Sequence, residues 1–192
     1  MRSQMDTETK SKIIKTARRL FTRKGYFNTS IRDISGEAGL SIGAIYHYFN
    51  GKEDIAEYLY TDTLQFLMKN LKEALGDEKD VKEKFKRIIE LFYRLTDEFP
   101  DIMEYALYVK HREIMRDNRT ICSSEPFEYI IKIVADAIVK GEIRDMDPLL
   151  ATATLMGLPI RLITLKLDGV IQDNLLNYVG ETLDSCWRAL RR

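Results

Sequence analysis

Apolar residues recur every three or four positions along almost the whole chain, and this spacing limits the possible folds more than any other feature. It is the spacing of one face of an α-helix, whereas the alternation that marks a strand is absent. Glycine and proline are scarce, with 10 and 4 among 192 residues, so few positions interrupt a helix. The sequence therefore predicts an all-α protein of about nine helices.

Four helices are expected in the first 75 residues. The first ends near Lys24, and its basic side, formed by Lys12, Lys15, Arg18 and Arg19, is expected to lie opposite an apolar stripe of Ile13, Ile14, Ala17, Leu20 and Phe21. The second is expected over 30–38, because Ser30 and Asp33 have the spacing of a capping box. The third spans 41–48, and the fourth runs over 52–75 with Asn50 and Glu53 as its cap.

Five later helices are expected at 81–98, 100–116, 125–140, 148–167 and 174–191. Pro159 falls inside the fourth of them, so we expect a kink near Gly157. No linker, repeat or low-complexity tract separates the helices.

Charge is unevenly distributed although the net charge is zero. Residues 1–52 hold 10 Lys or Arg against 4 Asp or Glu, which leaves a balance of −6 on the rest of the chain. A basic module is typical of a protein that binds a polyanion, because Lys and Arg that neutralise phosphates release counterions. A solvated basic surface is the alternative. We expect two domains, residues 1–52 and 53–192, built for different partners.

Gly39 separates the second and third helices, and its surroundings suit a helix-turn-helix. The glycine would supply the left-handed turn residue, and Ser35 is small enough to let two helices approach. The wedge between these helices is expected to consist of Ile34, Ala38, Leu40 and Ile45. A helical hairpin with a purely structural role is the alternative.

If Ile45 and Phe49 turn inward, the third helix has an outer surface that suits the major groove of DNA. This surface would consist of Ile42, Gly43, Ala44, Tyr46 and His47. Tyr46, His47 and Tyr48 would then face the sugar-phosphate backbone and the groove wall. Lys52 begins the fourth helix, where a cationic side chain and the positive end of the helix dipole would together anchor a phosphate.

The segment SIRDISGEAGLSIGAIYHYFNGKEDI, residues 30–55, resembles the DNA-binding signature of the tetracycline-repressor (TetR) family of bacterial transcriptional regulators. The shared features are a Ser-x-Gly start of the recognition helix, a Tyr-x-Tyr-Phe end and the Lys-Glu pair that follows. The similarity is specific over residues 13–59, and beyond them it extends to the number and lengths of the helices and to the turn KGEIRDMDP.

The resemblance implies a homodimer that places its recognition helices in successive major grooves of a palindromic operator, and it leaves open whether the protein represses or activates transcription. Gly43, Ala44 and Tyr46 would approach bases, next to Ser41 and Ile42. Phosphate contacts would come from Thr29, Ser30, His47, Tyr48 and Lys52. Because Ile42 and Ala44 offer no hydrogen bonds, base readout would depend on thymine methyl groups and on DNA shape.

The larger domain is rich in aromatic residues and methionine, which fill a core or line a pocket equally well. The resemblance implies an apolar cavity enclosed by the helices from the fourth to the eighth, and hence a lipophilic effector of drug or lipid type. The predicted lining residues are Phe66, Met103, Leu107, Tyr108, His111, Phe127 and Met156. A place in the core is the alternative for each of them. Four nearby basic side chains would either contact an acidic headgroup of the effector or form a solvated face, namely Lys110, Arg112, Arg116 and Arg119.

The last two helices carry enough apolar surface for a four-helix interface between two copies of the chain. The predicted interface residues are Leu155, Leu158, Leu176, Val179, Leu183 and Trp187. Arg161 would either pair across this interface or enter the effector cavity.

An enzyme is not expected, because no nucleophile has a neighbouring histidine, no ligand set has metal spacing and no glycine-rich loop would cradle phosphate. No cofactor or metal is expected. Cys122 and Cys186 suit reduced thiols, and apolar runs shorter than about 18 residues with a charged start predict a cytoplasmic protein. A DNA-binding regulator or architectural protein without a small-molecule effector is the remaining alternative to a ligand-responsive repressor.

Overall fold

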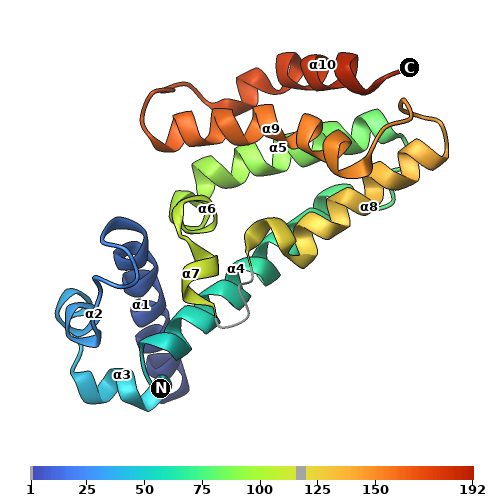
Figure 1. Ribbon diagram of the computed structural model, residues 1–192. Coiled ribbons are helices and arrows are strands. Elements are labelled where there is room, and N and C mark those ends of the chain that lie inside the picture. Colours follow the sequence, from blue (N-terminus) through green and yellow to red (C-terminus); the bar gives the residue numbers. More distant parts are fainter. Residues whose placement is uncertain (1, 116–119) are drawn as a thin grey trace. The chain divides into compact units, whose positions relative to one another are not determined.

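The computed structural model describes residues 2–115 and 120–192, with side chains from residue 6 onward apart from Cys122. The described residues form ten α-helices and two short 3-10 helices and contain no strand, which confirms the predicted all-α fold (Figure 1). In chain order the elements are α1 (Arg2–Arg23), α2 (Ile31–Ala38), α3 (Ile42–Tyr48), α4 (Lys52–Leu75), α5 (Val81–Glu98), α6 (Pro100–Tyr108), α7 (His111–Ile114), η1 (Ile121–Ser123), α8 (Glu125–Val139), α9 (Pro148–Leu167), η2 (Leu175–Tyr178) and α10 (Val179–Leu190).

Backbone contacts divide the chain into two compact units. Unit 1 holds the residues up to Leu64 together with Asp101–Ile121, and unit 2 holds Gln65–Pro100 together with Cys122–Arg192. Unit 1 therefore extends beyond α1, α2 and α3 to include the first half of α4, most of α6, and α7. The functional boundary expected after residue 52 stays a prediction.

The core of unit 1 forms where the apolar faces of its helices meet. Its buried residues are Ile13, Ala17, Leu20, Phe21, Tyr26, Ile34, Ile45, Phe49, Ile55, Ala56, Leu59, Tyr60, Tyr105 and Met115. The predicted apolar stripe of the first helix contributes four of these residues, with Ile14 only partly buried beside them. Burying each large aliphatic side chain stabilises a fold by about 1.5–3 kcal/mol.

Arg18 corrects the prediction that it belongs to a solvated basic side of α1. Its side chain is only 6% exposed and pairs with Asp62 of α4 at 2.9 Å and with Asp101 of α6 at 3.0 Å. A guanidinium can be buried when carboxylates satisfy its charge, and no periodicity in α1 reveals that they come from positions 44 and 83 residues away. Arg18 therefore joins three helices of unit 1.

Unit 2 is built around α9, which packs against α5, α8 and α10 (Figure 1). The hydroxyl groups of Tyr93 on α5 and Thr182 on α10 share a buried hydrogen bond of 2.9 Å. Among the described residues, α9 is the one helix long and apolar enough to cross a membrane by length and mean hydropathy. The sequence analysis did not expect an apolar stretch of this length. One third of that stretch is buried in the protein. A cytoplasmic location stays a prediction.

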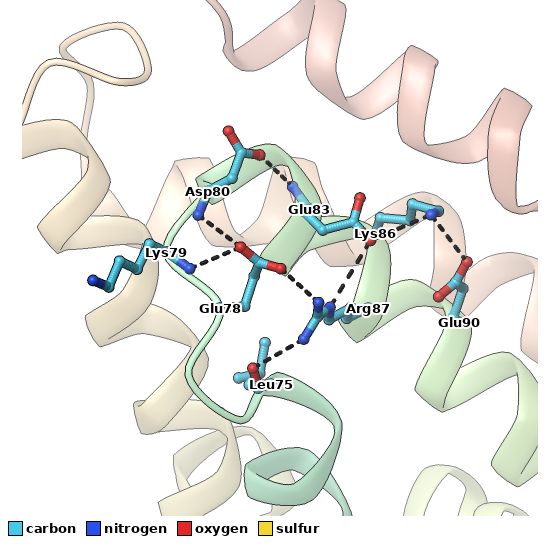
Figure 2. A network of polar contacts seen from close by, with 8 residues as sticks. All are labelled: Leu75, Glu78, Lys79, Asp80, Glu83, Lys86, Arg87 and Glu90. Atoms are coloured by element: carbon cyan, nitrogen blue, oxygen red, sulfur yellow. Dashed lines mark hydrogen bonds and ion pairs between the residues drawn. The ribbon is translucent and has the colours of Figure 1, made fainter.

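The turn between α4 and α5 is fixed by the polar network of Figure 2. The carboxylate of Glu78 accepts hydrogen bonds from the backbone amides of Lys79 and Asp80, and these bonds lower the pKa of Glu78. Arg87 pairs with Glu78 and donates to the Leu75 carbonyl at 3.2 Å, which satisfies an acceptor at the end of α4. Asp80 then caps α5, because its side chain accepts from the Glu83 amide at 2.8 Å.

Two predicted helices are divided in the structure. The helix expected over 100–116 ends at Tyr108 and resumes as α7, and Arg116 lies outside the described residues. The break is stabilised by the ring of His111, whose Nε2 lies 3.0 Å from the Tyr105 carbonyl oxygen. The helix expected over 174–191 begins instead as the 3-10 helix η2, where the Asn174 side chain accepts from the Leu176 amide at 2.8 Å.

The cap of α4 also differs from the prediction. Asn50 does not form a capping box with Glu53. Its backbone amide and side-chain amide both donate to the carboxylate of Asp54, over 3.0 and 3.1 Å. Asp54 therefore takes the place that the sequence analysis assigned to Glu53. Pro159 lies inside α9, and the expected kink there stays a prediction.

Candidate nucleic-acid interface

The start of α2 is held by a capping box between Ser30 and Asp33, as its spacing predicts. The Ser30 hydroxyl oxygen accepts from the Asp33 amide at 3.1 Å, and the Asp33 carboxylate accepts from the Ser30 amide at 2.8 Å. Hydrogen bonds from the Ser30 hydroxyl and backbone lower the pKa of Asp33. The first turn of α2 is thus fixed by local chemistry.

The turn from α2 to α3 uses the conformational freedom of Gly39. This residue has φ +61° and ψ +38°, the left-handed region that residues with a side chain rarely adopt. Ser35 donates a hydrogen bond of 2.6 Å to the Leu40 carbonyl across the turn. Ser35 therefore does more than permit close approach of the helices, because it also ties the two sides of the turn together.

The helix α3 has one buried face and one exposed face. Ile45 is fully buried and Phe49, which follows the helix, is nearly so, whereas Tyr46 is 54% exposed. Ile42, Gly43 and His47 are also exposed, and Ala44 is half-buried. The structure thus orients α3 as the sequence analysis expects, with both anchors inside and the predicted base-contacting face outside.

The N-terminus of α3 is capped by Ser41. Its hydroxyl oxygen accepts from the Ala44 amide at 3.1 Å. Gly43 has room around it, since a Cβ added there would find its nearest neighbour 3.9 Å away at the Ser41 hydroxyl. The fold of unit 1 therefore does not require glycine at position 43.

Thr29 has a different place from the one predicted. It is only 2% exposed, and its hydroxyl donates to the Gly25 carbonyl at 2.9 Å in the turn before α2. Its backbone amide donates to the Tyr26 carbonyl at 3.2 Å. This geometry makes Thr29 a residue of the turn and does not support a phosphate contact, whereas Ser30 is exposed.

Lys52, the predicted phosphate anchor, is half-buried at the start of α4. Its Nζ donates to the Tyr26 carbonyl at 2.9 Å and lies 4.2 Å from the centre of the Tyr26 ring. Burial, followed by the nearby Glu53, raises the pKa of Tyr26 to about 12. An ammonium group has three protons to donate, so two remain after the bond to Tyr26. The predicted role of Lys52 is compatible with this position.

Tyr48 is half-buried at the end of α3, and its hydroxyl is occupied. It donates to Oδ1 of Asp6 on α1 at 2.7 Å, and this hydrogen bond is the main cause that raises the pKa of Tyr48. In this conformation the hydroxyl has no further proton for a phosphate. Sequence reasoning missed Asp6, because nothing in the pattern of α1 indicates a partner 42 residues away.

The predicted effector-lining residues are divided between the two units. Unit 1 holds Met103, Leu107, Tyr108 and His111, and unit 2 holds Phe66, Phe127 and Met156. Met103, His111 and Met156 are buried, Tyr108 is exposed, and the other three are half-buried. All of them except the exposed Tyr108 are compatible with a core place, and the predicted cavity stays a prediction. Of the basic group named with them, Lys110 and Arg112 are exposed, and Arg116 and Arg119 lie outside the described residues.

The predicted dimer residues also differ in exposure. Leu158 and Leu176 are exposed, Trp187 is half-buried against Phe85, and Val179 and Leu183 are buried. Leu155 is fully buried in unit 2, where its carbonyl accepts from the Cys186 thiol at 3.4 Å, so it belongs to the core. Arg161 is exposed on α9 next to Thr164. Among residues 6–115 and 120–192 apart from Cys122, no three His, Cys, Asp or Glu side chains are grouped for a metal ion.

The capped α2, the glycine turn and the outward face of α3 define a helix-turn-helix protein of the DNA-binding regulator class. Comparison with known families agrees. The family described as bacterial regulatory proteins, tetR family, matches residues 13–59. Over these residues the chain has the sequence of a tetR-family regulatory protein.

Individual relatives support the same assignment. The HTH-type transcriptional regulator YerO of Bacillus subtilis (strain 168) is 35% identical over 118 residues, which is 59% of this chain and 39% of that relative. The chain spans less than half the length of this relative and of the next two curated relatives it matches.

Solved structures are similar over nearly the whole chain. A TetR family transcription regulator from Marinobacter aquaeolei VT8 has a TM-score of 0.82 at 19% identity, with 99% of this chain and 98% of that chain covered. The transcriptional regulator FadR from Bacillus subtilis, in complex with stearoyl-CoA, has a TM-score of 0.68 at 20% identity, with 92% and 96% covered. These likenesses show that unit 2 has the fold of the family as well.

Proposed function

We propose that this protein is a ligand-responsive transcriptional repressor that binds a palindromic operator as a homodimer and is released by a lipophilic small molecule. The observation that carries the proposal is the orientation of α3. Its two anchors, Ile45 and Phe49, are buried, while Ile42, Gly43 and Tyr46 form an open surface. A short helix with such a surface fits the major groove, and a two-fold axis would place two copies about 34–36 Å apart in successive grooves.

The phosphate contacts in this proposal come from the edges of the same surface. Ser30 and His47 are exposed, and Lys52 has donors to spare at the positive end of α4. The balance of +6 charges over residues 1–52 would attract the DNA backbone before specific contacts form. Base recognition would depend on the Ile42 and Ala44 methyl groups and on DNA shape, because neither side chain forms hydrogen bonds.

For the effector we propose a fatty acyl-CoA or a similar lipophilic thioester. Support comes from the stearoyl-CoA complex of the Bacillus subtilis regulator, which shares the fold over 92% of this chain. A fatty acid metabolism regulator protein of the same species is 23% identical over 87% of this chain. An apolar tail would suit Phe66, Phe127 and Met156 in unit 2. Effector binding would shift the population of conformations away from the one that fits the operator.

The DNA-binding part is tested with Gly43→Ala. The fold leaves space for the added methyl group and α3 gains a better helix former, so stability is expected to stay the same or rise by up to about 1 kcal/mol. Operator affinity is expected to fall at least about tenfold, because the methyl group occupies the surface that approaches the bases. The operator would be found by footprinting DNA upstream of the gene, and affinity measured by fluorescence anisotropy.

Gly36→Ala is the matched control, since its added methyl group has space too, with no atom within 4 Å, but lies on α2. Operator affinity should be retained in this variant. Equal affinity of the Gly43→Ala and wild-type proteins would refute α3 as the base-contacting helix.

The effector part is tested by adding stearoyl-CoA to the protein with and without operator DNA. Binding at 100 times Kd should stabilise the protein by about 2.7 kcal/mol and should release the DNA. Coenzyme A without the acyl chain is the control. A protein that binds the operator equally well at saturating stearoyl-CoA would instead favour a regulator that does not respond to this effector class.

A further inference from the structure

The last residue of α3 is held by an acidic side chain of α1. Tyr48 donates to Oδ1 of Asp6 over 2.7 Å. A hydrogen bond to a carboxylate is stronger than one between neutral groups. The bond to Asp6 engages the hydroxyl of Tyr48, and the sequence analysis assigns this side chain to a DNA phosphate.

A tyrosine hydroxyl has a single proton to donate. A DNA phosphate offers acceptors only, and so does the carboxylate of Asp6. Tyr48 therefore donates to the carboxylate or to a phosphate, but not to both. Lys52 does not face this choice, because its ammonium keeps two protons after its bond to the Tyr26 carbonyl.

The charge of Asp6 acts in the same direction as the competition for the proton. The side chain of Asp6 is exposed, and its carboxylate lies at the end of α3. Lys10, one turn along α1, is directed to aromatic rings instead, with its Nζ 4.3 Å from the centre of the Tyr58 ring. An exposed carboxylate repels phosphates within the screening length of about 10 Å at 0.1 M salt.

We propose that Asp6 limits the DNA affinity of this regulator by holding the Tyr48 hydroxyl in the DNA-free state, so that a phosphate must displace the carboxylate during binding. The inference rests on the proposed function of α3 and adds a residue that precedes the matched family region, which begins at residue 13. Its consequence is a lower affinity for any duplex, because the competition concerns the DNA backbone and not the bases.

The test is a double-mutant cycle in the full-length protein without effector. The proteins are the wild type, Asp6→Ala, Tyr48→Phe and the double variant, each titrated by fluorescence anisotropy with the footprinted operator and with a random duplex of equal length. Asp6→Ala is expected to tighten binding to both duplexes about five-fold per subunit, which corresponds to the typical net contribution of one hydrogen bond. Tyr48→Phe should weaken binding about five-fold when Asp6 is absent and less than two-fold when it is present.

Glu8→Ala is the charge control, because Glu8 is an exposed acid on the same helix, two residues from Asp6. It should tighten binding less than Asp6→Ala, and its effect should not depend on Tyr48. Asp6→Asn keeps an acceptor without the charge and should fall between the wild type and Asp6→Ala. Melting temperatures of all variants establish that each is folded.

The outcomes separate this inference from the function on which it rests. If the folded wild-type protein binds neither duplex, the proposed function fails. If the wild type binds but Asp6→Ala weakens binding, Asp6 positions Tyr48 for the DNA. The proposed competition between Asp6 and a phosphate is then refuted. Equal effects of Tyr48→Phe with and without Asp6 would also refute it.

Discussion

Ile45 and Tyr46 are neighbours on α3 with opposite surroundings, and replacing each by alanine tests the orientation of this helix. Ile45 is fully buried between α3 and the rest of unit 1. Truncating a buried isoleucine to alanine costs about 2–5 kcal/mol, because the apolar contacts are lost and a cavity remains. Tyr46 is mostly exposed, and such substitutions usually change the free energy of unfolding by less than about 0.5 kcal/mol.

The two variants should therefore separate stability from DNA binding. For a protein of this length, 1 kcal/mol corresponds to about 2–4 °C in melting temperature, so a loss of about 3 kcal/mol in Ile45→Ala lowers Tm by about 6–12 °C. Tyr46→Ala should melt within about 2 °C of the wild type, yet lose about tenfold or more in operator affinity.

Thermal unfolding followed by circular dichroism and DNA titration followed by fluorescence anisotropy measure the two quantities independently. The reasoning depends on the order of the effects. If Tyr46→Ala lowered Tm as much as Ile45→Ala did, or if it left operator affinity unchanged, the assignment of inner and outer faces of α3 would be refuted.

Three further predictions concern stability. Burial lowers the pKa of His111 below its ordinary value of 6.5, so the unfolded chain binds more protons than the folded one. The free energy of unfolding should therefore decrease as the pH falls below about 6.5. When Tm is measured from about pH 7.5 to pH 5.5, His111→Gln should show a smaller decrease than the wild type. Arg18→Met removes two ion pairs whose aspartates are nearly half exposed, so urea unfolding should show a loss of about 1–3 kcal/mol, and an unchanged midpoint would contradict a stabilising role. Gly39→Ala should cost about 1–2 kcal/mol because of its left-handed backbone alone, since the added Cβ meets no atom within 4 Å, and Gly39→Asn should cost less if that explanation is correct.

Much of the architecture could be read from local patterns. The bounds of α4, α5 and α9 agree with the predicted ranges, and the Ser30–Asp33 capping box and the left-handed Gly39 are present. These features depend on residues close in sequence, so caps, turns and apolar periodicity are sufficient to predict them. The exposed and buried faces of α3 follow from the same periodicity.

The errors arise where contacts of another side chain or packing between helices override a local preference. The helix expected over 100–116 is interrupted where the His111 ring takes up the Tyr105 carbonyl. The cap expected from Glu53 comes from Asp54, a neighbouring acid with the same chemistry. Leu155 has the composition of an interface residue, but the packing of α9 against its neighbours encloses it.

The sequence by itself determined the helices, the glycine turn and which side of α3 faces outward, because each follows from chemical preferences within a few residues. Tertiary structure decided which polar groups meet. The Arg18 guanidinium is buried because carboxylates from α4 and α6 reach it, and the Tyr48 hydroxyl is occupied because Asp6 of α1 lies next to it. A pairing between positions 42 or more residues apart leaves no periodic signal, since it depends on how the helices pack and not on how each one forms.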